Sequence, residues 1–508
     1  MASKLFIFAI GGTGSRVVKA LTMLLASGVE LKNTSEVIPI IVDPHKSNED
    51  LKRTESLLKT YKKIRDSLKD KPKPGEFFGT EVKTLKNIIN NNDNVADTYT
   101  FELKGVSNET FGNYIDYDTL AGDTEEFDSY EPNKDLASLL FSKKNLETEM
   151  NIGFVGNPNI GSVVLNQFKE SEEFKQFASK FSQNDRIFII SSIFGGTGAA
   201  GFPIILKNIR GAEAGDLSNP EFLRNAKIGA LTALPYFSLE ANDDNDKKID
   251  NQTFCLKTTA ALNYYVRGVN KSVNRLYYIG DDLTTTYTYD AGENGQKNDA
   301  HFIELASALA IVDFAATSDE ELKNYDGIPL ETTYKEFGIR EENEKLIFSH
   351  LDNSTLKIIG RALSKMTLLT LYTQYRLESV VGGNMAWLKE SPMIDKGFTE
   401  GLFYKTFLGD FKKDYFDWLN EMAKNKRGFE PFKLTHDLAQ LITTDGLKPK
   451  RSLNPFASKT DFPALDEALN KFCKGQQFSS AEDKFLKAIG SGSDAFLNDK
   501  FADLFKNL

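Results

Sequence analysis

Two glycine-rich turns, far apart along the chain, each follow an apolar run with the length of a buried strand. The first turn, residues 11–15, follows residues 5–10, and the second, residues 195–198, follows residues 187–192. An apolar run that breaks into glycines and then opens a helical pattern predicts a strand, a tight turn and a helix N-terminus. Glycines let backbone N–H groups approach a phosphate closely, and the helix adds the positive end of its dipole. The pair therefore predicts a nucleotide phosphate tail held from two sides.

Composition narrows the class of protein. The 508 residues are 40% hydrophobic and include 38 Phe and 18 Tyr, which is ample for large globular cores. A net charge of −10, from 62 basic and 72 acidic residues, argues against a protein that coats nucleic acid. Two cysteines without a CxxC pair and four scattered histidines favour neither a disulfide framework nor a zinc site. Because no segment approaches the ~20 apolar residues of a membrane span, we expect a cytoplasmic protein without one.

Strand-like apolar runs alternate with helical patterns from residue 4 to residue 317, which predicts a mainly parallel sheet covered by helices on both faces. We expect a nucleotide-binding domain over residues 1–317, with an insertion at the sheet edge over residues 50–148 and a long central helix over residues 299–316. Residues 318–508 are expected to form a mostly helical C-terminal domain and tail. The expected strands are residues 5–10, 37–42, 152–155, 187–191, 228–234 and 276–279.

Taken alone, the first turn has a second interpretation. Gly12, Gly14 and Val17 occupy the three glycine places of the dinucleotide-binding fingerprint, and Asp43 ends the second strand where that fold carries an acidic residue. A Rossmann NAD(P)-dependent oxidoreductase therefore remains an alternative, although its third glycine is missing.

The second turn favours a different interpretation. The sequence Gly195-Gly196-Thr197-Gly198-Ala-Ala-Gly resembles the glycine signature of the tubulin/FtsZ superfamily, Gly-Gly-Gly-Thr-Gly-Ser/Thr-Gly, which leads into a helix. Further segments resemble that family in the same order along residues 4–317, about three fifths of the chain. Residues 153–161 look like its third phosphate loop, residues 42–45 like its second loop, residues 234–236 like the start of its ribose loop, and Asn298-Asp299 like the base-contacting end of its central helix.

The resemblance implies an α/β tubulin/FtsZ-like GTPase domain followed by an α-rich C-terminal region, and it implies GTP or GDP with Mg²⁺ as the ligand. Asp43 would hold the Mg²⁺ through a bound water, because this ion favours oxygen ligands and keeps several waters. Asn298 or Asp299 would read the guanine edge, although both are equally good helix N-caps. The implied nucleotide-binding residues are Gly11, Gly12, Thr13, Gly14, Ser15, Asp43, Gly156, Asn157, Gly161, Gly195, Gly196, Thr197, Gly198, Pro235, Asn298 and Asp299.

The chain departs from the family at several positions. Phe194, Ala199 and Ala200 replace a glycine, a hydroxyl residue and a glycine of the signature, and His45 replaces the acidic residue two after Asp43. In the family, an Asn-x-Asp-x-x-Asp/Glu loop after the central helix enters the next subunit's nucleotide site. Here Asp319, Glu320 and Glu321 match that loop by position only, and an exposed acidic helix start explains them equally well.

The function implied is that of a divergent bacterial or phage tubulin-like protein, which polymerises head to tail into filaments and hydrolyses GTP at the subunit interface. An alternative from a different class is a nucleotide-binding switch or scaffold that does not polymerise, for example in a multi-gene phage-defence system. In either case residues 318–508 are a candidate surface for protein partners, and no nucleic-acid partner is expected.

Overall fold

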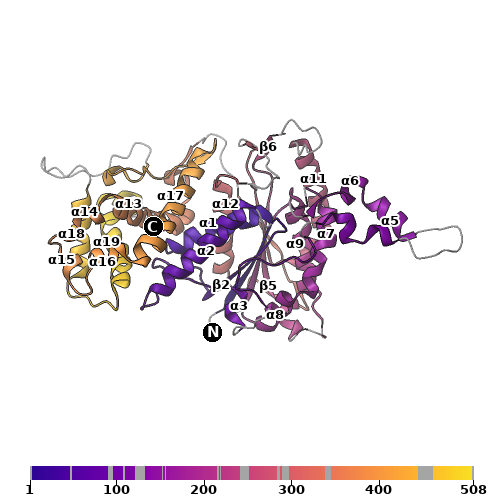
Figure 1. The fold of residues 1–508 in the computed structure, drawn as a ribbon, viewed down its shortest axis with the longest axis horizontal. Coiled ribbons are helices and arrows are strands. Elements are labelled where there is room, and N and C mark those ends of the chain that lie inside the picture. The colour runs from indigo at the N-terminus through magenta and orange to yellow at the C-terminus, as the bar shows by residue number, and fades with distance from the viewer. Residues whose placement is uncertain are drawn as a thin grey trace.

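The computed structural model describes residues 3–45, 48–89, 95–106, 109–120, 132–150, 153–154, 156–213, 215, 217, 219–240, 251–282, 286–288, 297–337, 345–443 and 461–505. In this part of the chain, a seven-stranded sheet forms the centre of the molecule, with strand order β11-β7-β5-β4-β1-β2-β3 and every neighbouring pair parallel (Figure 1). The strands are β1 (Lys4–Ile10), β2 (Glu36–Val42), β3 (Glu81–Val82), β4 (Arg186–Ser192), β5 (Lys227–Ala233), β7 (Arg275–Ile279) and β11 (Thr333–Phe337).

The central strands are buried on both faces, which explains their continuous apolar sequences. All seven residues of β4 are buried, as are the last six of β1, β2 and β5. Pro39 lies inside β2 without disturbing it, because β3 pairs only with Glu36 and Val37 and leaves that edge of β2 free at the proline. The α/β class expected from the alternating sequence is confirmed.

Helices cover both faces of the sheet (Figure 1). On one face lie α1 (Gly11–Ala26), α2 (Glu49–Ser67) and the central helix α12 (Phe302–Ala316). On the other face lie α7 (Pro158–Val164), α8 (Glu172–Lys180), α9 (Gly196–Arg210) and, beyond them, α11 (Asn251–Tyr264). Fifteen of the sixteen residues of α1 are buried, because this helix lies between the sheet and the C-terminal helices.

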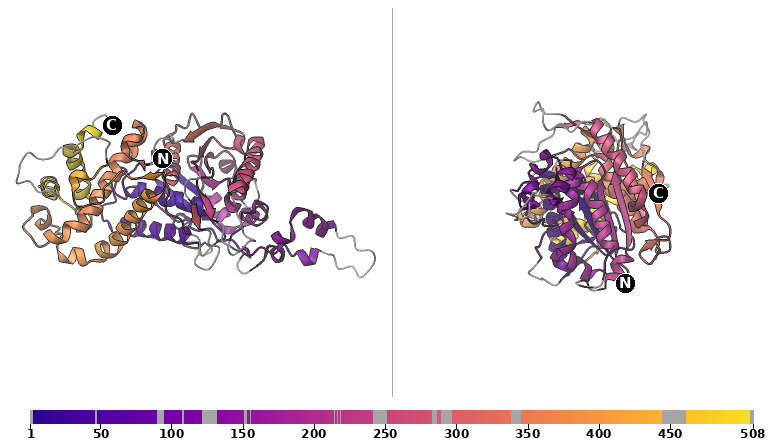
Figure 2. Two further views of the ribbon diagram at one scale, coloured as in Figure 1. Left: turned by 90° about the horizontal axis from the view of Figure 1, so that it is seen from above. Right: turned by 90° about the vertical axis from the view of Figure 1, so that its right-hand side faces the viewer.

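The stretch expected as an insertion divides into two parts. Helix α2 packs on α1, and β3 joins the sheet, so residues 49–82 belong to the central fold. The following segment contains α3 (Leu85–Ile88), α4 (Phe111–Tyr114), α5 (Pro132–Leu140) and α6 (Lys143–Leu146). It ends in a projection that carries α5 and α6 away from the body of the molecule (Figure 2). The acidic part of the expected insertion, residues 121–131, lies outside the described residues.

The C-terminal region is mostly helical, as expected, and packs against α1 and α2 rather than standing apart (Figure 1). Phe78, after α2, meets Phe411 of α17 (Gly409–Lys424) with ring centroids 5.1 Å apart, and Phe302 of α12 meets Phe429 at the same distance. The core is therefore continuous between the two regions. The main helices are α13 (Asn353–Tyr375), α17 (Gly409–Lys424), α18 (Phe462–Cys473) and α19 (Ala481–Lys500).

Three expectations from the sequence need correction. The central helix begins at Phe302 rather than at residue 299, because the His301 side chain caps it by accepting a hydrogen bond from the backbone of Ile303. Strand β11 lies after residue 317, so the sheet extends into the region expected to be helical. Of the strand expected over residues 152–155, Gly153 and Phe154 are not in a strand, and residues 152 and 155 lie outside the described residues.

Among the described residues, no helix is both long enough and apolar enough to cross a membrane.

Candidate functional site

The two glycine turns lie side by side at one edge of the sheet. They follow β1 and β4, which are adjacent and parallel, at the point where the strand order reverses direction, the usual ligand position of such sheets. A methyl group placed on Gly11 would lie 3.5 Å from the Cβ atom of Thr197 and 3.7 Å from the backbone nitrogen of Gly198. Gly11 also has a φ of +72°, which strains any other residue.

The third loop lies against the second. A methyl group on Gly196 would come within 3.0 Å of the backbone nitrogens of both Gly156 and Asn157. One on Gly161 would lie 2.8 Å from the Cβ atom of Ala200 in α9. The small residues at these positions let three loops from distant parts of the sequence meet at one edge of the sheet.

The helices that start in the first two loops present uncapped N-termini to this edge. Neither α1 nor α9 has a side-chain hydrogen bond at its N-cap, and neither has an acidic residue in its first turn. The Ser15 hydroxyl is buried and has no hydrogen-bond partner among the described residues. Two uncapped helix starts and an unsatisfied hydroxyl form a place suited to an anion.

Asp43 follows β2 at the same edge and is buried. Its Oδ1 accepts a hydrogen bond from the backbone of His45 at 3.0 Å, and Asn48 Nδ2 lies 3.5 Å from its Oδ2. Burial raises the pKa of Asp43 to about 7, against the effect of these hydrogen bonds. A buried carboxyl group of this kind fits a position near a bound cation, since a cation favours the ionised form. No cluster of three or more potential metal ligands occurs among the described residues.

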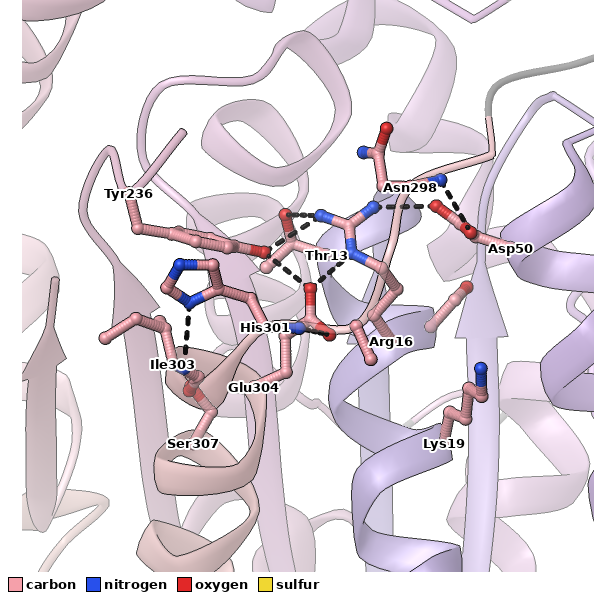
Figure 3. Close-up of polar contacts among 12 residues, drawn as sticks. Thr13, Arg16, Lys19, Asp50, Tyr236, Asn298, His301, Ile303, Glu304 and Ser307 are labelled. Atoms are coloured by element: carbon pink, nitrogen blue, oxygen red, sulfur yellow. Dashed lines mark hydrogen bonds and ion pairs between the residues drawn. The ribbon is translucent and has the colours of Figure 1, made fainter. Parts of the chain in front are cut away.

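Sequence reasoning missed a buried cluster of charges beside the first loop, centred on Arg16 of α1 (Figure 3). The guanidinium donates to Glu304 Oε1 at 2.5 Å, to Asp50 Oδ2 at 2.8 Å and to the Tyr236 hydroxyl at 2.9 Å. Tyr236 in turn donates to Glu304 Oε1 at 3.0 Å. The cluster joins α1, α2, α12 and the loop after β5, and a lone arginine among the apolar residues of α1 was its only signal in the sequence.

Burial would lower the pKa of Arg16, but Tyr236 and the two carboxylates outweigh it and raise that pKa. Burial raises the pKa of Glu304, against the effect of Arg16. His301 is also buried, which lowers its pKa to about 4, with the positive charges of Arg16 and Arg427 adding to the effect. The imidazole is therefore neutral at physiological pH, and its Nδ1 accepts from Ile303 at 3.1 Å.

The C-terminal region reaches this cluster through Glu421 of α17. Its Oε2 accepts from the backbone of Ala300 at 3.0 Å and lies 3.4 Å from Lys19 Nζ, and its Oε1 pairs with Arg53. The segment that leads into α12 is thus held between α1, α2 and the C-terminal helices.

The residues proposed to read a base lie in this segment. Asn298 is buried, its backbone nitrogen lies 3.3 Å from Asp50 Oδ1, and its backbone oxygen lies 3.5 Å from Arg53. Asp299 is partly exposed. Because α12 starts at Phe302, neither residue is its N-cap. Pro235 follows β5 and places Tyr236 in the cluster; contact of these residues with a nucleotide stays a prediction.

The three acidic residues expected to act on a neighbouring subunit lie at the opposite edge of the sheet, after the end of α12. Asp319 Oδ1 lies 2.7 Å from Arg186 and 2.8 Å from Lys227, the first residues of β4 and β5. Glu321 lies 3.1 Å from Arg275, and Glu320 pairs with Lys323. Burial would raise the pKa of Asp319, but hydrogen bonds from Lys227 and Arg186 outweigh it and lower that pKa.

No protein-family model matches the chain, and no curated protein matches it. Among solved structures, the chain is similar to CetZ from Methanosaeta thermophila strain DSM 6194 with 12% identity and a TM-score of 0.26, over 55% of this chain and 46% of that one. It is also similar to CetZ2 from Haloferax volcanii, described as a GTPgS-bound protofilament, with 13% identity and a TM-score of 0.28, over 62% of this chain and 60% of that one. The match thus spans about half to three fifths of these tubulin/FtsZ-family proteins.

Proposed function

We propose that the protein is a tubulin-like nucleotide-binding protein that holds the phosphate tail of GTP between its three loops. The single observation that carries this proposal is the meeting of the loops at residues 11–15, 156–161 and 195–198, where α1 and α9 begin uncapped. Backbone N–H groups there would donate to phosphate oxygens, and both helix dipoles would favour the negative charge.

The residues divide the phosphate tail between them. Gly11, Gly12, Gly14 and Ser15 would bind the inner phosphates, and the Ser15 hydroxyl would find there the partner it lacks. The second loop would enclose the outer phosphates with the Thr197 hydroxyl as an added donor. The third loop would approach the terminal phosphate, and Asp43 would hold a water of the Mg²⁺ ion that accompanies it.

The order of the six strands from β3 to β7 is shared with the dinucleotide-binding fold, so topology alone does not separate the two. What supports the tubulin-like interpretation is the second glycine loop, which brings a second helix start so close to the first that a methyl group on Gly11 would contact Thr197. GTP is the nucleotide that the sequence resemblance implies.

We further propose that copies of the chain associate head to tail. The acidic residues after α12 lie at the sheet edge opposite to the phosphate loops, which is where a neighbour's loops would meet them in a polar filament. An apolar patch lies next to them in sequence, with side chains 65–77% exposed: Tyr325, Ile328 and Leu330. An exposed patch of this kind supports a protein contact.

A second candidate, a switch that binds GTP without hydrolysing it, is favoured by the ion pairs of the acidic residues. Asp319 is already paired with Arg186 and Lys227 of its own chain, so action on a neighbour requires that these contacts open.

The test is calorimetric titration of the protein with GTP, GDP, ATP and NAD⁺ in the presence of Mg²⁺, followed by light scattering with GTP. Binding of guanine nucleotides alone supports the phosphate site, and binding of NAD⁺ alone would overturn it in favour of an oxidoreductase. Scattering that rises with GTP above a threshold protein concentration supports assembly. Tight GTP binding without scattering or phosphate release supports the switch.

A further inference from the structure

Lys257 of α11 reaches the third loop of the proposed phosphate site. Its Nζ atom donates to the backbone oxygen of Gly156 at 2.6 Å. The backbone nitrogen of the same glycine lies 3.0 Å from where a methyl group on Gly196 would be, at the start of α9. The ammonium group is therefore bound to a loop that touches the N-terminus of the second loop's helix.

A contact further along the chain holds α11 in this position. The helix continues into a π-helical turn, Tyr265–Val269, whose first residue contacts α9 twice. The Tyr265 hydroxyl donates to the backbone oxygen of Ala199 at 3.3 Å, and its ring lies edge-on to Phe202 with centroids 5.4 Å apart. Lys257 precedes this anchor by about 12 Å of helix, so its place beside the loop is set by packing.

The Lys257 side chain has no carboxylate partner among the described residues. Among the residues that the structure describes, its one hydrogen bond or ion pair is to the Gly156 carbonyl, although the side chain is half-buried. Burial lowers its pKa, with no acidic group opposing the effect. The buried arginines behave differently: Arg16 and Arg186 both have acidic partners. A partly desolvated cation without an anion gains most when an anionic ligand arrives beside it.

We propose that Lys257 is the counter-charge of the terminal phosphate of a bound nucleoside triphosphate. The inference rests on the proposed function, since it requires that the three loops hold a phosphate tail. When the nucleotide binds, the flexible lysine side chain gives up its hydrogen bond to the Gly156 carbonyl. Its ammonium group, a compact charge, then donates a hydrogen bond to an oxygen of the terminal phosphate. A diphosphate does not extend to this position, so Lys257 makes the site prefer the triphosphate.

The test compares GTP and GDP binding to the native full-length chain, to Lys257→Gln and to Lys257→Arg, by calorimetry with Mg²⁺ present. Loss of a charged hydrogen bond to phosphate is expected to weaken GTP binding by about 10- to 100-fold in Lys257→Gln. GDP binding is expected to change by less than about threefold, and Lys257→Arg is expected to retain most of the preference for GTP. Lys271→Gln, at an exposed lysine after α11, is the control and should bind both nucleotides as the native protein does.

The two proposals fail in different ways. Suppose that the native protein binds GTP and that Lys257→Gln weakens the binding of GTP and GDP equally, or changes the binding of neither. Lys257 then only supports the loop or has no role in binding, so the inference is wrong while the proposed function stands. If the native protein binds neither nucleotide, both are wrong. Circular dichroism checks the fold of each variant. If Lys257→Gln unfolds, Lys257→Met, which keeps an unbranched apolar chain, replaces it, and its GTP and GDP affinities are compared in the same way.

Discussion

An arginine cluster lies at each end of the central helix α12, and the two differ in burial. At the N-terminal end, the side chains of Arg16, Asp50 and Glu304 are only 2–6% exposed. At the C-terminal end, Arg186 is equally buried, but its partner Asp319 is 60% exposed. A buried charge left without its partner is costly, whereas an exposed pair contributes little. The first cluster therefore fixes the edge where the glycine loops meet. In the second cluster the carboxylate faces solvent, and Arg186 keeps the backbone oxygens of Phe314 and Ala315 as partners when Asp319 leaves it.

The largest effect is expected from breaking the buried cluster. Arg16→Met leaves Asp50 and Glu304 buried without their cation, so we expect the free energy of unfolding to fall by about 3–5 kcal/mol. Urea denaturation followed by circular dichroism measures it.

The matched control is Arg361→Met, because Arg361 pairs with Asp494 on the surface, with side chains 33% and 39% exposed. Its loss is expected to cost at most about 1 kcal/mol. Equal effects of the two substitutions would show that burial does not distinguish the clusters.

Asp43 and Asp319 should change the pH dependence of stability in opposite ways, because their pKa values are shifted in opposite directions. For Asp43 the pKa is about 7 in the folded chain, while an unfolded aspartate has a pKa of about 3.9. Between these values the folded state keeps a proton that the unfolded state releases. Asp43 therefore makes the free energy of unfolding fall as pH rises from about 4 to about 7, by up to about 1.4 kcal/mol per pH unit.

Because other groups also titrate, the quantity to measure is the difference between the native protein and Asp43→Asn in urea denaturation at several pH values. The native protein should lose stability relative to the variant as pH rises through this window. A difference that does not vary with pH would mean that Asp43 is already ionised at pH 4. Asp319 has the opposite sign: its lowered pKa adds stability that is lost as pH falls.

The sequence predicted those features that depend on residues close together in the chain, and it missed those that depend on residues far apart. The glycine loops were predictable because Gly11 and Gly196 act through their own backbone, directly after an apolar strand. The Arg16 cluster was not, since Asp50 and Glu304 are 34 and 288 positions away and meet the arginine only in the folded chain.

The start of α12 and the last strand were missed for related reasons. His301 caps the helix although histidine is not a usual N-cap residue, so the sequence favoured Asn298 and Asp299, which are good caps. Strand β11 has the polar sequence Thr-Tyr-Lys-Glu-Phe at an exposed edge, and it carries no apolar run to indicate a place in the sheet.

A smaller effect is expected from one hydroxyl of the second glycine loop. Thr197→Val keeps the shape of the second loop but removes its hydroxyl donor, so GTP affinity should fall by about tenfold while stability stays within about 0.5 kcal/mol. Thr232→Val is the control, because the Thr232 hydroxyl is buried in β5 without a partner among the described residues. If both substitutions leave GTP affinity unchanged, Thr197 does not contact the phosphates.

At the exposed cluster we expect only a modest effect on stability, and the functional effect is the most informative. Asp319→Asn should lower the free energy of unfolding by less than Arg16→Met does, because the asparagine oxygen can still accept from Arg186, which also donates to the backbone oxygens of Phe314 and Ala315. GTP binding should stay unchanged, because Asp319 lies at the sheet edge away from the loops. If hydrolysis is completed between subunits, this variant releases no phosphate from GTP. Gly198→Val, whose side chain would collide with the backbone of Ser192, should also be inactive, through loss of the phosphate site. Mixing the two inactive variants pairs an intact phosphate site with an intact acidic segment at some interfaces, so phosphate release should return in the mixture. A mixture that stays inactive, beside an active native protein, would show that Asp319 does not act on its neighbour.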